Sequence, residues 1–323
     1  MHLFPISFKN KSSDLFNKIS TRTATVIHLT HNDLDAAGCD AICRITFGSG
    51  ILTLFSSVRG FSWISSQISK CNGNGNLLII SDLGYQPGIE VQISKLRESN
   101  WIIKWYDHHK WLPTEIECIR SLVDTLVVDT SVCATGVLYN QYAKDNPIAK
   151  EVSKVVCDYD LWKLQDPRSE ILGLVSSKRE NIELIRDKLL NGIIIDDDIS
   201  KLYDDIVKNR DACINKSLNH SKLYQGNKYK IAVMPSYGYP SETAAVARKK
   251  YGSDIELLVL DSGKFSLRSV APISHIIARN FKGGGHPNAS GGSFVYGFKE
   301  KWCLKLFGKV SGVDEFIKVV DTL

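Results

Sequence analysis

Residues 101–109 have the sequence Trp-Ile-Ile-Lys-Trp-Tyr-Asp-His-His, in which a largely apolar run ends in three polar side chains. A short apolar run bounded by polar residues is typical of a buried strand in a parallel sheet. Two other apolar runs also end in polar side chains. The run 26–30 leads into His-Asn-Asp-Leu-Asp at 31–35, and the run 77–80 leads into Ser81-Asp82. Open α/β sheets bind ligands beyond the carboxyl ends of their strands, so we expect these ends to share one site.

Helical patterns alternate with these strands. The alternation predicts an α/β fold with a mostly parallel, doubly wound sheet and right-handed crossovers. From about residue 191 the chain becomes acidic and helical, and a hairpin signal at 261–263 with a glycine-rich segment after it indicates a smaller α+β domain. We therefore expect a first domain at 1–195 with an N-terminal arm at 1–24, a helical linker at 196–225, and a second domain at 226–323.

Length and composition allow two ordinary globular cores in the 323 residues, with a mild net charge of +5 that permits a phosphate-rich partner without requiring one. No apolar stretch approaches the roughly 20 residues of a membrane helix, so we expect no membrane partner. The eight cysteines are scattered without a CxxC pair, which predicts reduced thiols in a cytoplasmic protein. Residues 1–24 are basic and rich in Ser and Thr, so a transit peptide is an alternative to a plain arm.

The polar strand ends carry ligands for hard divalent ions. His31, Asp33 and Asp35 alternate, so an extended segment would place the three side chains on one side. With Asp82 and His108 they form a set of carboxylates and imidazoles suited to Mn²⁺ or Mg²⁺. The set is large for one ion and fits two ions about 3.5–4 Å apart that share a carboxylate. Helix caps and turns are the alternative for any single Asp, but they explain the whole set less well.

Other features of the sequence are weaker evidence for a functional site. The glycine segment 283–286 could approach an anion closely, although a helix C-cap followed by a loop is the preferred explanation for this segment taken alone. Arg268 has a side chain suited to phosphate, but a surface charge is the ordinary interpretation. The aromatic residues near 101–106 and 158–162 are more typical of a core than of a base-stacking platform. The Walker phosphate loop and the nucleophile elbow of serine esterases are absent from the sequence.

Five motifs in order resemble those of the DHH/DHHA1 phosphoesterase superfamily over about residues 25–295. They are His31-x-Asp33-x-Asp35, the strand-terminal Asp82, Asp107-His108-His109, Asp158-Tyr-Asp-Leu-Trp162, and Gly283-Gly-Gly-His-Pro-Asn-Ala-Ser-Gly291. Within the superfamily, the first and fourth motifs most resemble the nanoRNase B type of oligoribonuclease. The resemblance implies a DHH domain followed by a DHHA1 domain, with the active site in the cleft between them.

The resemblance also implies roles for single residues. Two divalent ions are expected, most simply Mn²⁺, with Mg²⁺ or Co²⁺ as alternatives. The implied ligands are His31 and Asp33 on one ion, Asp35, His108 and Asp158 on the other, and Asp82 as the bridge. Asp158 is preferred to Asp160 because of where Leu161 and Trp162 fall in the motif. His109 is expected to contact the scissile phosphate and Asp107 to orient a ligand histidine, while Arg268, Ser269, Gly284, Gly285 and His286 are expected to bind substrate.

The expected function is a two-metal phosphodiesterase that converts short RNA into nucleoside 5′-monophosphates. The alternative substrate is a small nucleotide, such as 3′-phosphoadenosine 5′-phosphate or a cyclic or linear dinucleotide. An inorganic pyrophosphatase or a nucleotide-binding module without catalysis fits less well. The sequence leaves open whether the chain forms a homodimer.

Overall fold

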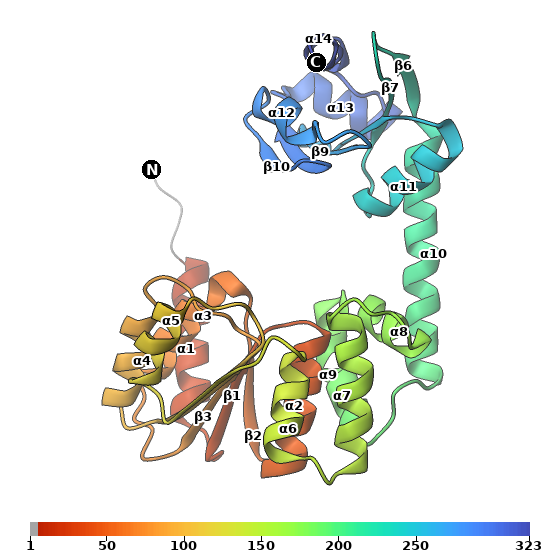
Figure 1. Ribbon diagram of the computed structural model, residues 1–323. Helices are drawn as coiled ribbons and strands as arrows, with labels where there is room; N and C mark the ends of the chain where they lie inside the picture. The colour runs from red at the N-terminus through yellow and green to blue at the C-terminus, as the bar shows by residue number, and fades with distance from the viewer. Residues whose placement is uncertain (1–5) are drawn as a thin grey trace. The chain divides into compact units, whose positions relative to one another are not determined.

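The computed structural model describes residues 6–323 and divides the chain into two compact units, which meet between Tyr203 and Asp204. This division lies inside helix α10 (Asp197–Asn219) and within the range where we expect a helical linker. Strand β6 (Lys222–Gln225) pairs with the next strand of the second unit, so the linker ends before residue 225. Each unit has its own sheet (Figure 1).

The first unit contains a five-stranded sheet in which every strand pair is parallel, and this confirms the predicted α/β fold. In sheet order the strands are β2 (Ile51–Phe55), β1 (Val26–Thr30), β3 (Leu77–Ser81), β4 (Ile102–Asp107) and β5 (Thr125–Val128). The strand order reverses between β1 and β3. A reversal of this kind opens a crevice at the carboxyl ends of the strands, where such sheets bind ligands.

The helices of the first unit pack against this sheet or, in the case of α7, α8 and α9, against other helices. In chain order they are α1 (Ile6–Ser20), α2 (Leu34–Phe47), α3 (Phe61–Ile68), α4 (Ile89–Glu98), α5 (Pro113–Arg120), α6 (Ala134–Tyr142), α7 (Pro147–Asp160), α8 (Pro167–Ser176) and α9 (Ile182–Leu190). Helix α2 is buried on every side from Leu34 to Cys43, as expected for a helix with neighbours all round, and it contacts α6, α7 and α9. Among the described residues, no helix is long and apolar enough to cross a membrane.

The N-terminal arm is folded rather than extended. Helix α1 covers most of the range 1–24, and Ile19 is fully buried in the core beneath the sheet. Leu15 packs against the same core. The first five residues of the predicted arm lie outside the described part of the chain.

The second unit contains a six-stranded sheet in which β7 and β8 are parallel and the other pairs are antiparallel. Its strands in sheet order are β10 (Gly284–His286), β11 (Ala289–Ser293), β9 (Lys264–Ser269), β8 (Ile255–Val259), β7 (Lys230–Pro235) and β6. Its remaining helices are α11 (Pro240–Tyr251), α12 (Ser274–Arg279), α13 (Phe298–Phe307) and α14 (Val313–Asp321). The predicted hairpin at 261–263 is confirmed by the antiparallel pairing of β8 and β9.

The glycine-rich segment of this unit is a hairpin strand and not an open loop. Gly285 has a φ of +140°, a backbone conformation that residues other than glycine rarely adopt. A Cβ atom on Gly283 would lie 1.9 Å from the carbonyl oxygen of Gly291, so the hairpin also needs glycine there. The glycines therefore serve the close pairing of β10 with β11.

Candidate metal centre

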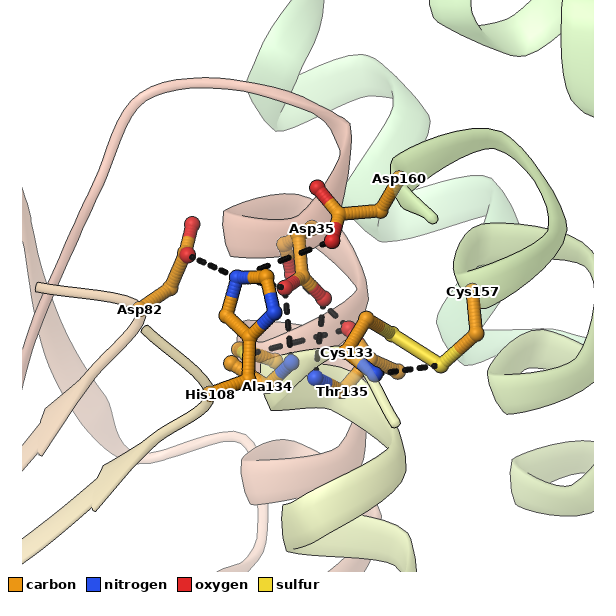
Figure 2. The surroundings of a disulfide bond; sticks show 9 residues. Asp35, Asp82, His108, Cys133, Ala134, Thr135, Cys157 and Asp160 are labelled. Carbon is orange, nitrogen blue, oxygen red and sulfur yellow. Dashed lines mark hydrogen bonds and ion pairs between the residues drawn. A yellow bond between two sulfur atoms is a disulfide. The ribbon is translucent and has the colours of Figure 1, made fainter. Parts of the chain in front are cut away.

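The first unit brings most of the predicted ligands together at the carboxyl ends of β1, β3 and β4. Asp82 directly follows β3 in the left-handed conformation, with a φ of 53°, and is buried. His108 directly follows β4. Figure 2 shows His108 pointing toward Asp82, Asp35 and Asp160, and its Nε2 lies 3.4, 3.8 and 3.6 Å from their nearest carboxylate oxygens.

Three overlapping groups of side chains could each hold a cation. Within each group, one ligand atom per residue lies within 4.8 Å of the others. The groups are His31 with Asp33 and Asp82, Asp35 with His108 and Asp160, and Asp82 with His108 and His109. Asp82 and His108 each belong to two groups, so the seven residues form one connected cluster, which we call the candidate metal centre.

The centre has the chemistry of a divalent cation site. Asp82 Oδ2 and Asp160 Oδ2 are buried without a hydrogen-bond partner among the described residues. A buried oxygen without a partner is destabilising, and a cation would supply the missing interaction. Carboxylate oxygens and imidazole nitrogens suit ions such as Mn²⁺. The residues present therefore fit a metal.

Electrostatics of the metal-free centre support the same interpretation. Burial, together with the charge of Asp160, raises the pKa of Asp35 to about 8. Burial and the nearby Asp35 raise the pKa of Asp82 well above its ordinary value, and burial also raises that of Asp160. Burial lowers the pKa of His108, which favours the neutral imidazole that a metal ligand requires. The protein thus gathers carboxylates that repel one another when no cation is bound.

Asp33 and Asp35 do not lie on one extended segment, so the prediction drawn from their alternation is wrong. Asp33 is the N-cap of α2 and accepts a hydrogen bond from the backbone N–H of Ala36 at 3.1 Å. Asp35 lies in the first turn of that helix, where its carboxylate accepts hydrogen bonds from the backbone N–H groups of Ala134 and Thr135, both at 2.8 Å. These two groups begin α6, and a helix N-terminus favours a negative charge. Asp33 therefore caps a helix and also faces the centre.

The structure places Asp160 beside His108, and not Asp158, which the sequence predicted as the ligand. The carboxylate of Asp158 accepts hydrogen bonds from the backbone N–H groups of Gln165 and Asp166 and from the hydroxyl of Ser169, at 3.1, 3.0 and 2.6 Å. It closes the turn between α7 and α8. Both aspartates lie in α7, and residues two apart in a helix project in different directions. The motif spacing alone could not decide which one faces His108.

Asp107 contacts His109 and not His108, the predicted ligand. It is fully buried, and its Oδ1 lies 2.8 Å from His109 Nδ1 while its Oδ2 accepts a 2.6 Å hydrogen bond from Trp111 Nε1. The hydrogen bond to Asp107 raises the pKa of His109. The His109 side chain is 52% exposed, which leaves its other nitrogen accessible to a substrate.

The predicted substrate contacts of the second unit fall into two kinds. Gly284, Gly285 and His286 are exposed in β10, and Arg268 Nη2 donates a 2.9 Å hydrogen bond to the exposed side chain of Ser241. The Ser269 hydroxyl is buried and bonds internally to Ala271 and Ser274. Ser269 is therefore corrected from a substrate contact to a structural residue.

The first unit also contains a disulfide that the sequence did not indicate. Cys133 and Cys157 are bonded across 24 residues, which corrects the prediction that every thiol is reduced. The six other cysteines are free, and they include Cys39 and Cys43, which are packed in the core. No CxxC spacing marked the bonded pair, so no pattern in the sequence could have identified it.

Together, the parallel sheet with its strand-end cluster and the separate second sheet fit a metal-dependent phosphoesterase, the class that comparison with known proteins also supports. No family model matches the chain. It is 24% identical over 297 residues to oligoribonuclease NrnB of Bacillus subtilis (strain 168). The matched region covers 82% of this chain and 72% of the relative. The ordered motifs, the fold and this distant relative support the similarity of the chain to the DHH/DHHA1 phosphoesterases.

Solved structures show the same fold. The pGpG-specific phosphodiesterase PggH from Vibrio cholerae superimposes with a TM-score of 0.54 at 13% identity, covering 91% of this chain and 99% of that one. An exonuclease RecJ bound to manganese gives a TM-score of 0.50 at 16% identity, covering 100% of this chain and 95% of that one.

Proposed function

We propose that this protein is a two-metal phosphodiesterase that hydrolyses short RNA oligonucleotides to nucleoside 5′-monophosphates. The observation that carries the proposal is the position of Asp82, which belongs both to the group with His31 and Asp33 and to a group with His108. A shared carboxylate is what two closely spaced ions require. The similarity to an oligoribonuclease supports short RNA as the substrate.

In this proposal His31 and Asp33 hold one ion, while Asp35, His108 and Asp160 hold the other. When bound, the two ions supply a nucleophile from water and stabilise the charge that develops on the phosphoryl group. We infer Mn²⁺ as the resident metal, with Mg²⁺ or Co²⁺ as alternatives, since the ligands are oxygens and imidazoles.

The chain's own residues orient the substrate. Asp107 holds Nδ1 of His109, so the remaining nitrogen of that ring is directed to donate a hydrogen bond to a phosphate oxygen. Arg268 and the strand 284–286 would bind the nucleotide end of the substrate. The six free thiols support a cytoplasmic location.

A substrate panel tests the proposal. With Mn²⁺ present, a labelled dinucleotide and trinucleotide RNA should release mononucleotide faster than 3′-phosphoadenosine 5′-phosphate releases phosphate, and pyrophosphate should remain intact. Release of phosphate from pyrophosphate alone would identify a pyrophosphatase, and binding without turnover would identify a binding module. Either result contradicts the proposal.

Variants connect this activity to the centre. Asp82→Ala and His108→Ala should abolish mononucleotide release while the circular dichroism spectrum keeps its helical signal. His220→Ala serves as the matched control, because it removes a half-buried histidine of the second unit that is not part of the candidate metal centre. Unchanged turnover in Asp82→Ala or His108→Ala would refute the two-metal assignment.

A further inference from the structure

The Cys133–Cys157 disulfide connects the two helices that position one half of the candidate metal centre. Cys133 is the N-cap residue of α6, and Cys157 lies in the last turn of α7. Figure 2 shows the bond beside the side chains of Asp35, His108 and Asp160. Neither cysteine belongs to a candidate metal-binding group, so neither has a role in the chemistry described above.

On the α6 side, the bond is attached to the turn that holds Asp35. The residues that directly follow Cys133 donate two backbone hydrogen bonds to the Asp35 carboxylate, and the Thr135 hydroxyl donates a third bond to the Asp35 carbonyl oxygen at 2.8 Å. A displacement of the α6 N-terminus therefore displaces the donors that fix Asp35.

On the α7 side, the bond is attached to the turn that bears Asp160. Cys157 precedes Asp160 by three residues, so the two side chains lie about one helical turn apart. Asp35 and Asp160 belong to the same group with His108. The disulfide thus links the supports of two carboxylates that would hold the same ion.

The surroundings of the bond leave little space for relaxation. Cys133 is fully buried and Cys157 is 8% exposed. A Cβ atom on Gly136 would lie 3.0 Å from the Cys157 sulfur, and one on Gly38 would lie 2.4 Å from the Thr135 hydroxyl, so α2, α6 and α7 pack closely. Two thiols need more room than a bonded pair, because sulfur atoms that are not bonded cannot approach so near. Closely packed helices accommodate this extra volume by shifting apart.

One end of the bond lies next to a hollow in the surface. Cys157 lines a surface hollow of about 680 Å³ together with Val132, Lys154 and Lys163. The hollow thus offers an approach to one sulfur of a bond that is otherwise buried.

We propose that the Cys133–Cys157 disulfide is a redox-dependent positioning device for the metal site formed by Asp35, His108 and Asp160. The proposal rests on the proposed function, since it assumes that these residues hold an ion. The reductant is a dithiol. One of its thiolates attacks a sulfur of the bond and forms a mixed disulfide, and its second thiol then releases that cysteine. Two electrons and two protons pass to the protein, which gains two thiols, while the reductant becomes a disulfide.

The oxidised protein keeps α6 and α7 together and binds the ion tightly. Reduction lets the two helices separate, so Asp35 and Asp160 fit the ion less well. We expect Mn²⁺ affinity to fall by at least about fivefold on reduction, which is the low end of coupling between two sites.

The experiment compares the full chain in both redox states after removal of metal and of excess reagent. A thiol titration of the denatured chain should count six thiols in the oxidised protein and eight in the reduced protein, since the chain has eight cysteines of which six are free. Calorimetric titration with Mn²⁺ should then show the loss of affinity in the reduced protein. The double variant Cys133→Ser/Cys157→Ser should bind Mn²⁺ like the reduced protein in both conditions.

Cys118→Ser is the matched control, because it removes an exposed free thiol and should keep the full redox response. Eight thiols in the oxidised protein, or equal Mn²⁺ affinity when the count changes by two, would overturn the proposal. The wild-type comparison decides the question even when the double variant fails to fold. Absence of Mn²⁺ binding in both redox states would overturn the proposed function and this inference with it.

Discussion

Replacing Asp82 by Asn should stabilise the metal-free protein at pH 8 and remove its response to Mn²⁺. Asp82 is buried, its Oδ2 has no hydrogen-bond partner among the described residues, and its pKa is raised by burial and by Asp35. Asn has nearly the same shape without the charge. It also tolerates the left-handed backbone at this position, where φ is 53°.

The magnitude follows from the charge that Asn removes, because leaving a buried charged oxygen without a partner costs at least about 1–3 kcal/mol. For a unit of this size, about 1 kcal/mol changes the melting temperature by roughly 2–4 °C. We therefore expect the metal-free Asp82→Asn variant to melt about 2–12 °C above the wild type at pH 8. Mn²⁺ at about a hundred times its Kd should stabilise the wild type by roughly 2.7 kcal/mol and leave the variant unchanged.

Differential scanning calorimetry with and without Mn²⁺ measures both effects. Asp129→Asn is the matched control, since Asp129 follows β5 but lies outside the candidate metal centre and bonds to Ser131. It should neither stabilise the metal-free protein nor change the Mn²⁺ response. A metal-free Asp82→Asn variant that melts below the wild type, or one that Mn²⁺ stabilises as strongly, would refute the reasoning.

Three further predictions concern the centre and the second unit. Asp160→Ala should lower Mn²⁺ affinity by at least roughly tenfold in a calorimetric titration. Asp158→Ala should retain affinity but lose about 1–3 kcal/mol of stability, because its buried carboxylate holds the turn between α7 and α8. The reverse pattern would restore Asp158 as the predicted ligand. The pKa of Asp35 rises from 3.8 to about 8 on folding, so its protonated form stabilises the metal-free protein below pH 4 and this contribution is lost as the pH rises toward 8. Melting temperatures of the metal-free protein should fall across that range, and a flat or rising profile would contradict burial of the Asp35 carboxyl as the cause. Arg268→Ala should raise the KM for a dinucleotide several-fold with little change in kcat, and a selective loss of kcat would assign Arg268 to the chemical step instead.

The sequence by itself determined the parallel sheet and the strand ends that carry ligands. Both follow from local patterns, because an apolar run followed by Asp or His forms a buried strand with a polar end wherever it occurs. Parallel strands bring such ends to one edge, so Asp82 and His108 could be assigned to one site before any contact was known.

Only the tertiary structure decided the finer arrangement of the site. Asp35 faces α6 because backbone N–H groups about 100 residues further along the chain donate hydrogen bonds to its carboxylate. Asp160 faces His108 and Asp158 does not, since the direction of each side chain depends on where α7 begins and ends. Cys133 and Cys157 meet because α6 and α7 pack against each other. Long-range contacts of this kind leave no periodic trace in the chain, which is why the sequence could name the ligand types but not every ligand.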